Sequence, residues 1–203
     1  MNEPMPASGP DSSDGEMFVV DSPYEIANWR ALVQWVLAIP HAIVLYVLNA
    51  VAGIVFLIYW VALIITGRLN GGMYGFLCMY ERYQMRAGSF LYGFSEIYPP
   101  FDFETGNDDN GEYPPTRVNL PAAPDETSRV AALNFFLAIP HYIVWMVYGI
   151  AASFVAIAGW FAVLFTGRWP AGMRDFLVKV ANYYLRIWVY VVMVDNRYPK
   201  FGI

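Results

Sequence analysis

The sequence has few charged residues, two histidines and a single cysteine. Only 14% of its 203 residues are charged, whereas soluble domains carry about 25% charged residues. The lone cysteine, Cys78, excludes an intramolecular disulfide and any metal site built from several cysteines. The net charge of -5 argues against nucleic acid as a partner, because such a protein needs a basic surface.

Apolar residues are abundant instead, at 58% of the chain, and 18% of all residues are aromatic. No charged side chain occurs between Pro40 and Thr66. As an α-helix that rises about 1.5 Å per residue, this stretch would be about 40 Å long. The apolar core of a bilayer is about 30 Å thick, so the sequence predicts a membrane protein.

The chain contains an internal repeat with a shift of 100 positions. The string "LAIPHAIV" at 37–44 returns as "LAIPHYIV" at 137–144, and "TGR" at 66–68 returns at 166–168. Residues 31–103 and 131–203 align without a gap, with 25 identities in 73 positions. Each half is therefore one duplicated structural unit.

The repeat and the composition divide the chain into four parts. Residues 1–16 are rich in Pro, Ser, Gly and acidic residues, lack the pattern of a signal peptide, and are expected to form a flexible acidic tail. The first membrane repeat is predicted over 17–103 and the second over 116–203. Between them, 104–115 forms an acidic linker that should be mobile on its own.

Each repeat is predicted to contain a short extended lead-in, an interfacial amphipathic helix and two transmembrane helices. In the first repeat these are 17–20, 24–39, the apolar span from Pro40 to Gly67, and 71–94. Four crossings in total would keep both units the same way up, related by a parallel pseudo-twofold axis along the membrane normal. An alternative remains for the charged segments 71–86 and 171–186, which could lie at the interface without crossing.

Three motifs resemble a known family. They are "LAIPH", an apolar run that closes on "W.A...TGR.P.GM.DF", and a terminal "YPPF". Together they resemble the bacterial family called domain of unknown function 4389, present here in two copies. The first copy departs from the motif at Asn70 and Gly75, where the second has Pro170 and Asp175. The resemblance implies a small multi-pass protein of the bacterial cytoplasmic membrane and implies no activity.

The only two histidines, His41 and His141, occupy equivalent positions at the start of the long apolar spans. The positive end of the helix dipole there favours neutral imidazole. Each histidine could form a local structural hydrogen bond, or contact a lipid head group or another anion. A third possibility is that the pseudo-twofold brings both to one haem or metal ion, because neutral imidazole is a good ligand.

Other side chains are candidates for contact with lipids or partner proteins. Arginine presents a planar fork that suits phosphate and carboxylate groups, although it can also simply anchor the end of an apolar span. Tryptophan is enriched at membrane interfaces. The candidate residues are Arg68, Arg168, Arg86, Arg186, Trp60 and Trp160.

The sequence shows no catalytic constellation and no recognisable cofactor motif. We therefore expect a non-enzymatic accessory or assembly subunit of a larger bacterial membrane complex, with lipids and other integral membrane subunits as partners. One alternative is a lipid- or solute-handling membrane protein. A second is a haem-binding electron-transfer subunit that uses His41 and His141.

Overall fold

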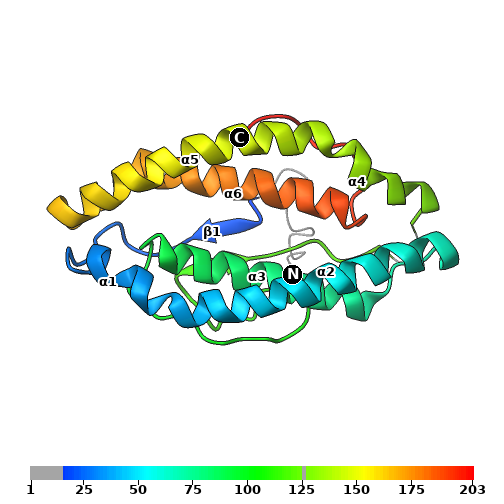
Figure 1. Ribbon diagram of the computed structural model, residues 1–203, viewed down its shortest axis with the longest axis horizontal. Helices are drawn as coiled ribbons and strands as arrows, with labels where there is room; N and C mark the ends of the chain where they lie inside the picture. Colours follow the sequence, from blue (N-terminus) through cyan, green and yellow to red (C-terminus); the bar gives the residue numbers. More distant parts are fainter. Residues whose placement is uncertain (1–15, 125–126) are drawn as a thin grey trace, which may run out of the picture.

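The computed structural model describes residues 16–124 and 127–203, so almost all of the predicted acidic tail lies outside the described residues (Figure 1). The fold is mostly helical and contains two similar repeats, as predicted. The first repeat comprises β1 (Phe18–Val20), α1 (Arg30–Leu37), α2 (Ile39–Thr66) and α3 (Gly71–Leu91). The second comprises β2 (Thr116–Val118), η1 (Arg129–Leu133), α4 (Asn134–Leu137), α5 (Ile139–Thr166) and α6 (Ala171–Val191).

A bend and a stop define the long helix of each repeat. Pro40 lies in the first turn of α2, where its missing N–H needs no intrahelical partner. Gly67 ends α2 with φ of 72°, and Gly167 ends α5 with φ of 66°, a left-handed conformation that glycine adopts without steric cost. Both ends of the apolar span are where the sequence predicts them.

The amphipathic helix before the bend is shorter than predicted. It begins at Arg30 in the first repeat, because the residues before it bind the second repeat instead. The N–H of Ile26 donates to the carbonyl of Gly167 at 2.8 Å, and the N–H of Trp169 donates to the carbonyl of Tyr24 at 2.8 Å. A helix over residues 24–29 could not form these bonds across the repeat boundary.

The four long helices form an outer pair, α2 and α5, and an inner pair, α3 and α6. The inner helix α3 buries 12 of its 21 residues, whereas the outer helix α2 buries only His41, Ala52, Tyr59 and Leu63 among 28. By length and composition, two stretches among the described residues could cross a membrane, Arg30–Thr66 and Arg129–Thr166. Both contain an outer helix, and the charged inner helices α3 and α6 do not meet the same criterion.

The two repeats run in opposite directions, which corrects the predicted parallel pseudo-twofold axis (Figure 1). Strands β1 and β2 pair antiparallel, with Phe18 opposite Val118. The start of the second repeat caps the end of α2, because Arg129 Nη2 donates to the carbonyl of Ile65 at 3.2 Å. In the same way, Asn28 Nδ2 donates to the carbonyl of Leu164 near the end of α5 at 2.9 Å. The axis relating the repeats is therefore perpendicular to the long helices.

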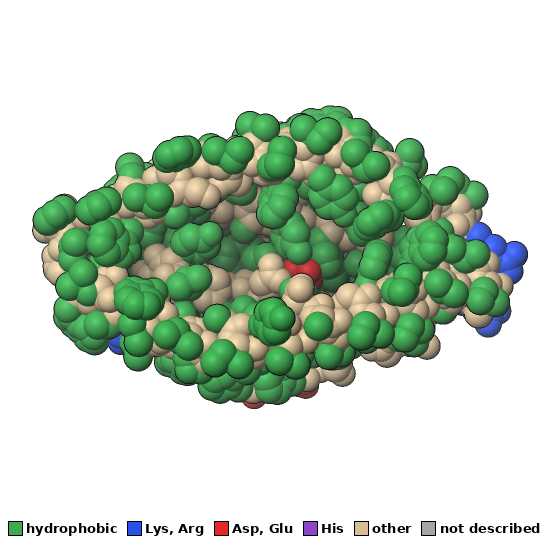
Figure 2. Space-filling model, viewed as in Figure 1, with side chains coloured by type: hydrophobic (Ala, Val, Ile, Leu, Met, Phe, Trp, Pro, Cys, Tyr) green, Lys and Arg blue, Asp and Glu red, His purple; other side chains and the backbone are tan. Residues whose placement is uncertain are grey.

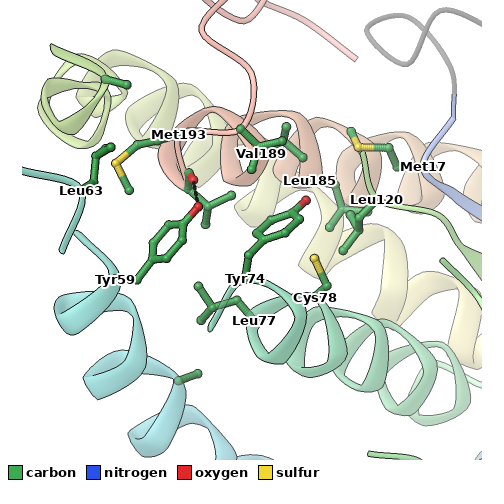
Figure 3. Close-up of a cluster of buried hydrophobic side chains, with 14 of the residues drawn as sticks. Met17, Tyr59, Leu63, Tyr74, Leu77, Cys78, Leu120, Leu185, Val189 and Met193 are labelled. Carbon is green, nitrogen blue, oxygen red and sulfur yellow. Dashed lines mark hydrogen bonds between the residues drawn. The ribbon is translucent and has the colours of Figure 1, made fainter. Parts of the chain in front are cut away.

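One apolar core joins the two repeats (Figure 3). Tyr59 lies at its edge, fully buried, and its hydroxyl donates to the carbonyl of Val192 at the end of α6 at 3.0 Å. The cluster draws on α2, α3 and α6 and on the strand and linker regions. Its members include Met17, Leu63, Tyr74, Leu77, Cys78, Leu120, Leu185, Val189 and Met193.

Candidate functional site

The histidine of the first repeat lies in an aromatic pocket formed by its own repeat. His41 Nδ1 lies 2.6 Å from the hydroxyl oxygen of Tyr83 on α3. Its ring stacks on Phe101, with centroids 4.5 Å apart, and contacts Tyr98 at 4.7 Å. The imidazole is thus held by one hydrogen bond and by ring packing, and its side chain is buried.

The second repeat reproduces this arrangement residue for residue. His141 Nδ1 lies 2.8 Å from the Tyr183 hydroxyl, and the ring stacks on Phe201 at 4.0 Å. Tyr198 contacts the ring at 4.8 Å. Within the described residues, Nε2 of both histidines is buried without a hydrogen-bond partner. Each imidazole is thus held through Nδ1 and ring packing alone.

The structure does not bring His41 and His141 together. They lie at the starts of α2 and α5, in separate pockets that are each formed by residues of their own repeat. A haem or metal ion shared by the two would need both rings at one point, so the shared site considered from the sequence is not formed within one chain. Among residues 16–124 and 127–203, no group of three or more His, Cys, Asp or Glu side chains could hold a metal ion.

Two buried arginines of α3 bind the linker, which the sequence predicts to be mobile on its own. Arg82 donates from Nη1 to the carbonyls of Gly106 at 3.1 Å and Asp108 at 2.7 Å, and from Nη2 to that of Glu104. The N–H of Gly106 in turn donates to the carbonyl of Gly75 at 3.2 Å. The linker therefore runs alongside α3 rather than free in solvent.

Arg86 binds two acidic side chains, Asp102 at the end of the first repeat and Asp109 in the linker. Its guanidinium lies 2.7 Å from a carboxylate oxygen of Asp102 and 2.8 Å from one of Asp109, and it donates to Asn110 at 2.9 Å. Burial acts to raise the pKa of Asp102, but hydrogen bonds from the Glu104 N–H, Asn110 and Arg86 outweigh it and lower that pKa. The charge of Arg86, predicted to contact lipid or a partner, is thus paired within the chain, although its Nε is buried without a hydrogen-bond partner.

The equivalent arginine of the second repeat is placed differently. Arg186 Nη2 donates to the carbonyl of Gly202 at 2.6 Å, and its guanidinium carbon lies 5.3 Å from the centre of the Tyr183 ring. Among the described residues it forms no ion pair with a carboxylate. It lines a cavity beside the C-terminal segment.

The arginines of the two TGR turns are exposed at opposite ends of the molecule. Arg68 follows the end of α2, and Arg168 follows the end of α5 with its Nε 3.5 Å from a carboxylate oxygen of Glu25. Both turns share one internal geometry, in which the Thr66 or Thr166 hydroxyl donates to a carbonyl one helical turn earlier. Both arginines are therefore accessible to an external anion.

The two candidate tryptophans hold the repeats together. Trp60 Nε1 donates to the carbonyl of Ala132 at 2.9 Å, and Trp160 Nε1 donates to that of Ala31 at 2.6 Å. Each bond therefore runs from the outer helix of one repeat to the short helix, η1 or α1, that precedes the outer helix of the other. The sequence suggested contact with lipid or a partner, and the partner of each indole N–H lies within this chain.

One face of the molecule is almost entirely apolar (Figure 2). We call it the apolar face; it consists of the exposed side chains of α1, α2, α4 and α5. In Figure 2 these side chains surround a central hollow in which an acidic group is visible, and charged groups otherwise show only at the edges. The most exposed members are Tyr46 at 82%, Phe165 at 76%, Ile65 at 70% and Phe154 at 70%.

The sequence interpretation missed the aromatic partners of the histidines. Tyr83, Tyr98 and Phe101 are each identical to the residue 100 positions later, so the signal was present in the repeat alignment. It also missed Glu81, which is buried on α3 and accepts a hydrogen bond from the Tyr184 hydroxyl at 3.0 Å. The repeat alignment gives no sign of that contact, because Ala181 occupies the position equivalent to Glu81.

Comparison with known proteins gives one result. Residues 28–102 and, separately, residues 130–202 match the model of a single family, described as a domain of unknown function (DUF4389). The matched segments correspond to the two repeats of the fold. No curated protein and no solved structure matches the chain.

Proposed function

This chain belongs to the DUF4389 family in two tandem copies, and we propose that it is a non-catalytic accessory or assembly subunit of a larger complex in the bacterial cytoplasmic membrane. The observation that carries the proposal is the exposure of the outer helices. Of the 28 residues in α5, only His141, Gly159 and Val163 are buried. A helix that is apolar on all sides requires lipid or the apolar segments of other proteins around it.

The linker supports an orientation in which the outer helices lie along the membrane plane. It contacts α3 from Gly75 to Arg86 and carries the exposed residues Glu104, Asp108 and Glu112. If α3 crossed the bilayer, these carboxylates would cross with it, at about 2.5 to 3.5 kcal/mol for an acidic residue at the centre. We infer that the apolar face enters the lipid and that the linker stays in water. This orientation replaces the four crossings expected from the sequence.

Labelling of single cysteines tests the orientation. In a Cys78→Ser background, cysteines are placed at Gly71, Ala171 and Glu112, all exposed, and cells are treated with an impermeant maleimide. The flat orientation predicts that all three react from one side of the membrane. Four parallel crossings predict that Gly71→Cys and Ala171→Cys react from the side opposite to Glu112→Cys. Crossing by antiparallel outer helices predicts that Gly71→Cys and Ala171→Cys react from opposite sides.

Native mass measurement tests the accessory role. After extraction in a mild detergent, we expect the chain in an assembly much heavier than its own 23.0 kDa. Replacing Ile150 on the apolar face with Ser should reduce that assembly, whereas Glu112→Ala on the linker should not. A chain recovered only as a stable monomer would contradict the proposal.

A lipid-handling role is the second candidate, and the hollow within the apolar face is the observation that favours it (Figure 2). Vesicles that contain the purified chain should then exchange a labelled lipid between leaflets faster than empty vesicles. Equal rates would remove this candidate. The haem-binding alternative has no support from the geometry, since His41 and His141 lie in separate pockets, each formed by its own repeat.

A further inference from the structure

A buried carboxylate of the first repeat lacks a cationic partner. Glu81 lies on α3 and is 2% exposed. Its Oε1 accepts a hydrogen bond from the Tyr184 hydroxyl of α6 at 3.0 Å, and its Oε2 is buried without a hydrogen-bond partner among the described residues. No basic side chain of those residues forms an ion pair with it, and residues 1–15 and 125–126 contain no Lys, Arg or His. A buried carboxylate is costly unless a cation or a proton balances its charge.

The neighbours of Glu81 extend the polar groups toward the apolar face. Tyr80 is half-buried, and its hydroxyl donates to the side-chain oxygen of Asn49 on α2 at 2.9 Å. Asn49 is exposed, on a helix whose other exposed side chains are mostly apolar. The hydroxyls of Tyr80 and Tyr184 both interact electrostatically with the Glu81 carboxylate. We call Asn49, Tyr80, Glu81 and Tyr184 the polar cluster; it connects the surface of the outer helix to the buried carboxylate.

The second repeat shows that the fold does not require the polar cluster. Three of its members belong to the first repeat, and each is replaced in the second: Asn49 by Gly149, Tyr80 by Val180 and Glu81 by Ala181. The helices α3 and α6 nevertheless have the same length, 21 residues, and each packs against the outer helix of its own repeat. The same helix pair therefore forms without the three polar side chains. A binding site present in one repeat alone accounts for this difference.

We propose that the polar cluster receives a lysine side chain from a membrane segment of another subunit, and that the lysine ammonium group pairs with Glu81. Ionisable residues of membrane proteins pair with one another and mark functional sites. Oε1 is already bonded to Tyr184, so one carboxylate oxygen remains. A compact ammonium group needs only one oxygen, whereas the planar fork of arginine suits two. The identity of this occupant rests on the accessory role proposed above.

The apolar face is suited to such a segment. Figure 2 shows that this face is hollowed at its centre and that an acidic group is visible there. The backbone of an apolar partner segment can contact the surrounding apolar side chains, while the flexible four-carbon stem of lysine carries the charge inward. Charge complementarity thus selects one segment among the many apolar ones that a membrane contains.

Two synthetic peptides test the pairing. Each is an apolar helix of about 20 residues. The two are identical except at the central position, which is lysine in one and norleucine in the other, so that the stem is kept and the ammonium group is removed. Binding of each fluorescently labelled peptide to the full chain is measured in a nonionic detergent at constant ionic strength. We expect the lysine peptide to bind at least about tenfold more tightly, because a buried charge pair forms only with it.

Glu81→Gln identifies the carboxylate. The amide keeps the size of the side chain and an acceptor for Tyr184 but removes the charge, so the preference for the lysine peptide should disappear. Glu112→Gln removes an exposed carboxylate of the linker and is the matched control, which should keep the preference. The proposal is overturned if the unaltered chain binds both peptides equally, a result that does not depend on how a variant folds. It is also overturned if Glu81→Gln keeps the preference.

Further outcomes separate this site from a lipid site and from the accessory role. If the peptides bind equally, and phosphatidylethanolamine is retained through purification by the parent but not by Glu81→Gln, the ligand is a lipid amine and the proposal is overturned. A heavy assembly in native mass measurement together with equal peptide binding rejects the lysine site and leaves the accessory role standing. A stable monomer that prefers the lysine peptide supports the site and contradicts the accessory role alone.

Discussion

At the scale of single residues, the repeats exchange the position of one bulky aromatic side chain. The first repeat has Tyr59 on its outer helix and Leu69 after its turn, whereas the second has Gly159 and Trp169 at the equivalent positions. The Trp169 indole donates to the carbonyl of Gly93 at 2.8 Å and lies against Gly159. The same volume is thus filled by the side chain of Tyr59 in the first repeat and by that of Trp169 in the second.

Gly159→Ala should therefore destabilise the protein. A Cβ at this position would lie 2.0 Å from the ring of Trp169, so the indole must move. We expect the free energy of unfolding to fall by about 1 to 3 kcal/mol, the usual cost of overpacking. Gly149→Ala in the same helix is the control, because its Cβ would meet nothing within 4 Å.

The double variant Gly159→Tyr with Trp169→Leu copies the first repeat and extends this prediction. It should be more stable than the sum of its two single variants predicts, because the two side chains share one space. Denaturation of all four forms in detergent gives the coupling energy. Strictly additive single effects would contradict the shared volume.

The tyrosine partners of the histidines give a second prediction at this scale. Tyr83→Phe and Tyr183→Phe each remove one hydrogen bond to a buried imidazole and keep the ring contacts. Each should lower the free energy of unfolding by about 1 kcal/mol, the usual net value of such a bond. Because the two sites are equivalent and far apart, the effects should be similar and additive. A large effect at only one site would show that the two pockets have diverged in role.

At the scale of secondary-structure elements, local chemistry was predictable and partners distant in sequence were not. Pro40 and Gly67 act through their own backbone conformations, so the sequence located both ends of α2. The role of α3 depends on Arg82 and Arg86 meeting a segment that begins at Asp102, 16 residues after Arg86, and continues into the linker. Nothing in the periodicity of α3 distinguishes an arginine that binds this linker from one that faces a lipid head group.

The same reasoning explains the error in symmetry. Sequence repeats establish that two units share a structure, but they do not fix the direction in which the units pack. Here the direction is set by Asn28 and Arg129, which each cap the other repeat's long helix. These two positions are not equivalent in the alignment, so the repeat pattern carried no sign of them.

The linker should detach from α3 only in acid. The pKa of Asp102 is lowered in the folded state, so its interaction with Arg86 adds stability above the ordinary carboxyl pKa of about 4. That stability is lost as the pH falls through the lowered value. Hydrogen exchange of residues 102–112 should therefore show protection at neutral pH and loss of protection only below about pH 4.

Three variants check this assignment. Asp102→Asn should reduce protection at neutral pH and weaken the acid-dependent step, whereas Glu112→Gln, at an exposed position, should change neither. Arg86→Gln leaves two buried carboxylates without their cationic partner and should cost about 3 kcal/mol or more. Protection that is unchanged in Asp102→Asn would mean that backbone contacts with Arg82 hold the linker alone.

At the scale of the whole molecule, the repeats are interlocked rather than joined end to end. The strands pair across the repeat boundary, α1 packs against α5, and η1 packs against α2. The largest buried cluster takes residues from both halves. We therefore expect a single cooperative unfolding transition instead of two.

The tryptophan pair tests this interlocking. Trp60→Phe and Trp160→Phe each remove one hydrogen bond between repeats and retain an aromatic ring. Each should lower the free energy of unfolding of the entire chain by about 1 kcal/mol, and the double variant should show the sum. Unfolding in detergent, followed by circular dichroism and by tryptophan fluorescence, should give coincident transitions in all three variants, since coincidence of probes is the test of two-state behaviour. Two separate transitions in either single variant would show that each repeat is stable alone, and that these bonds only orient one finished unit on the other.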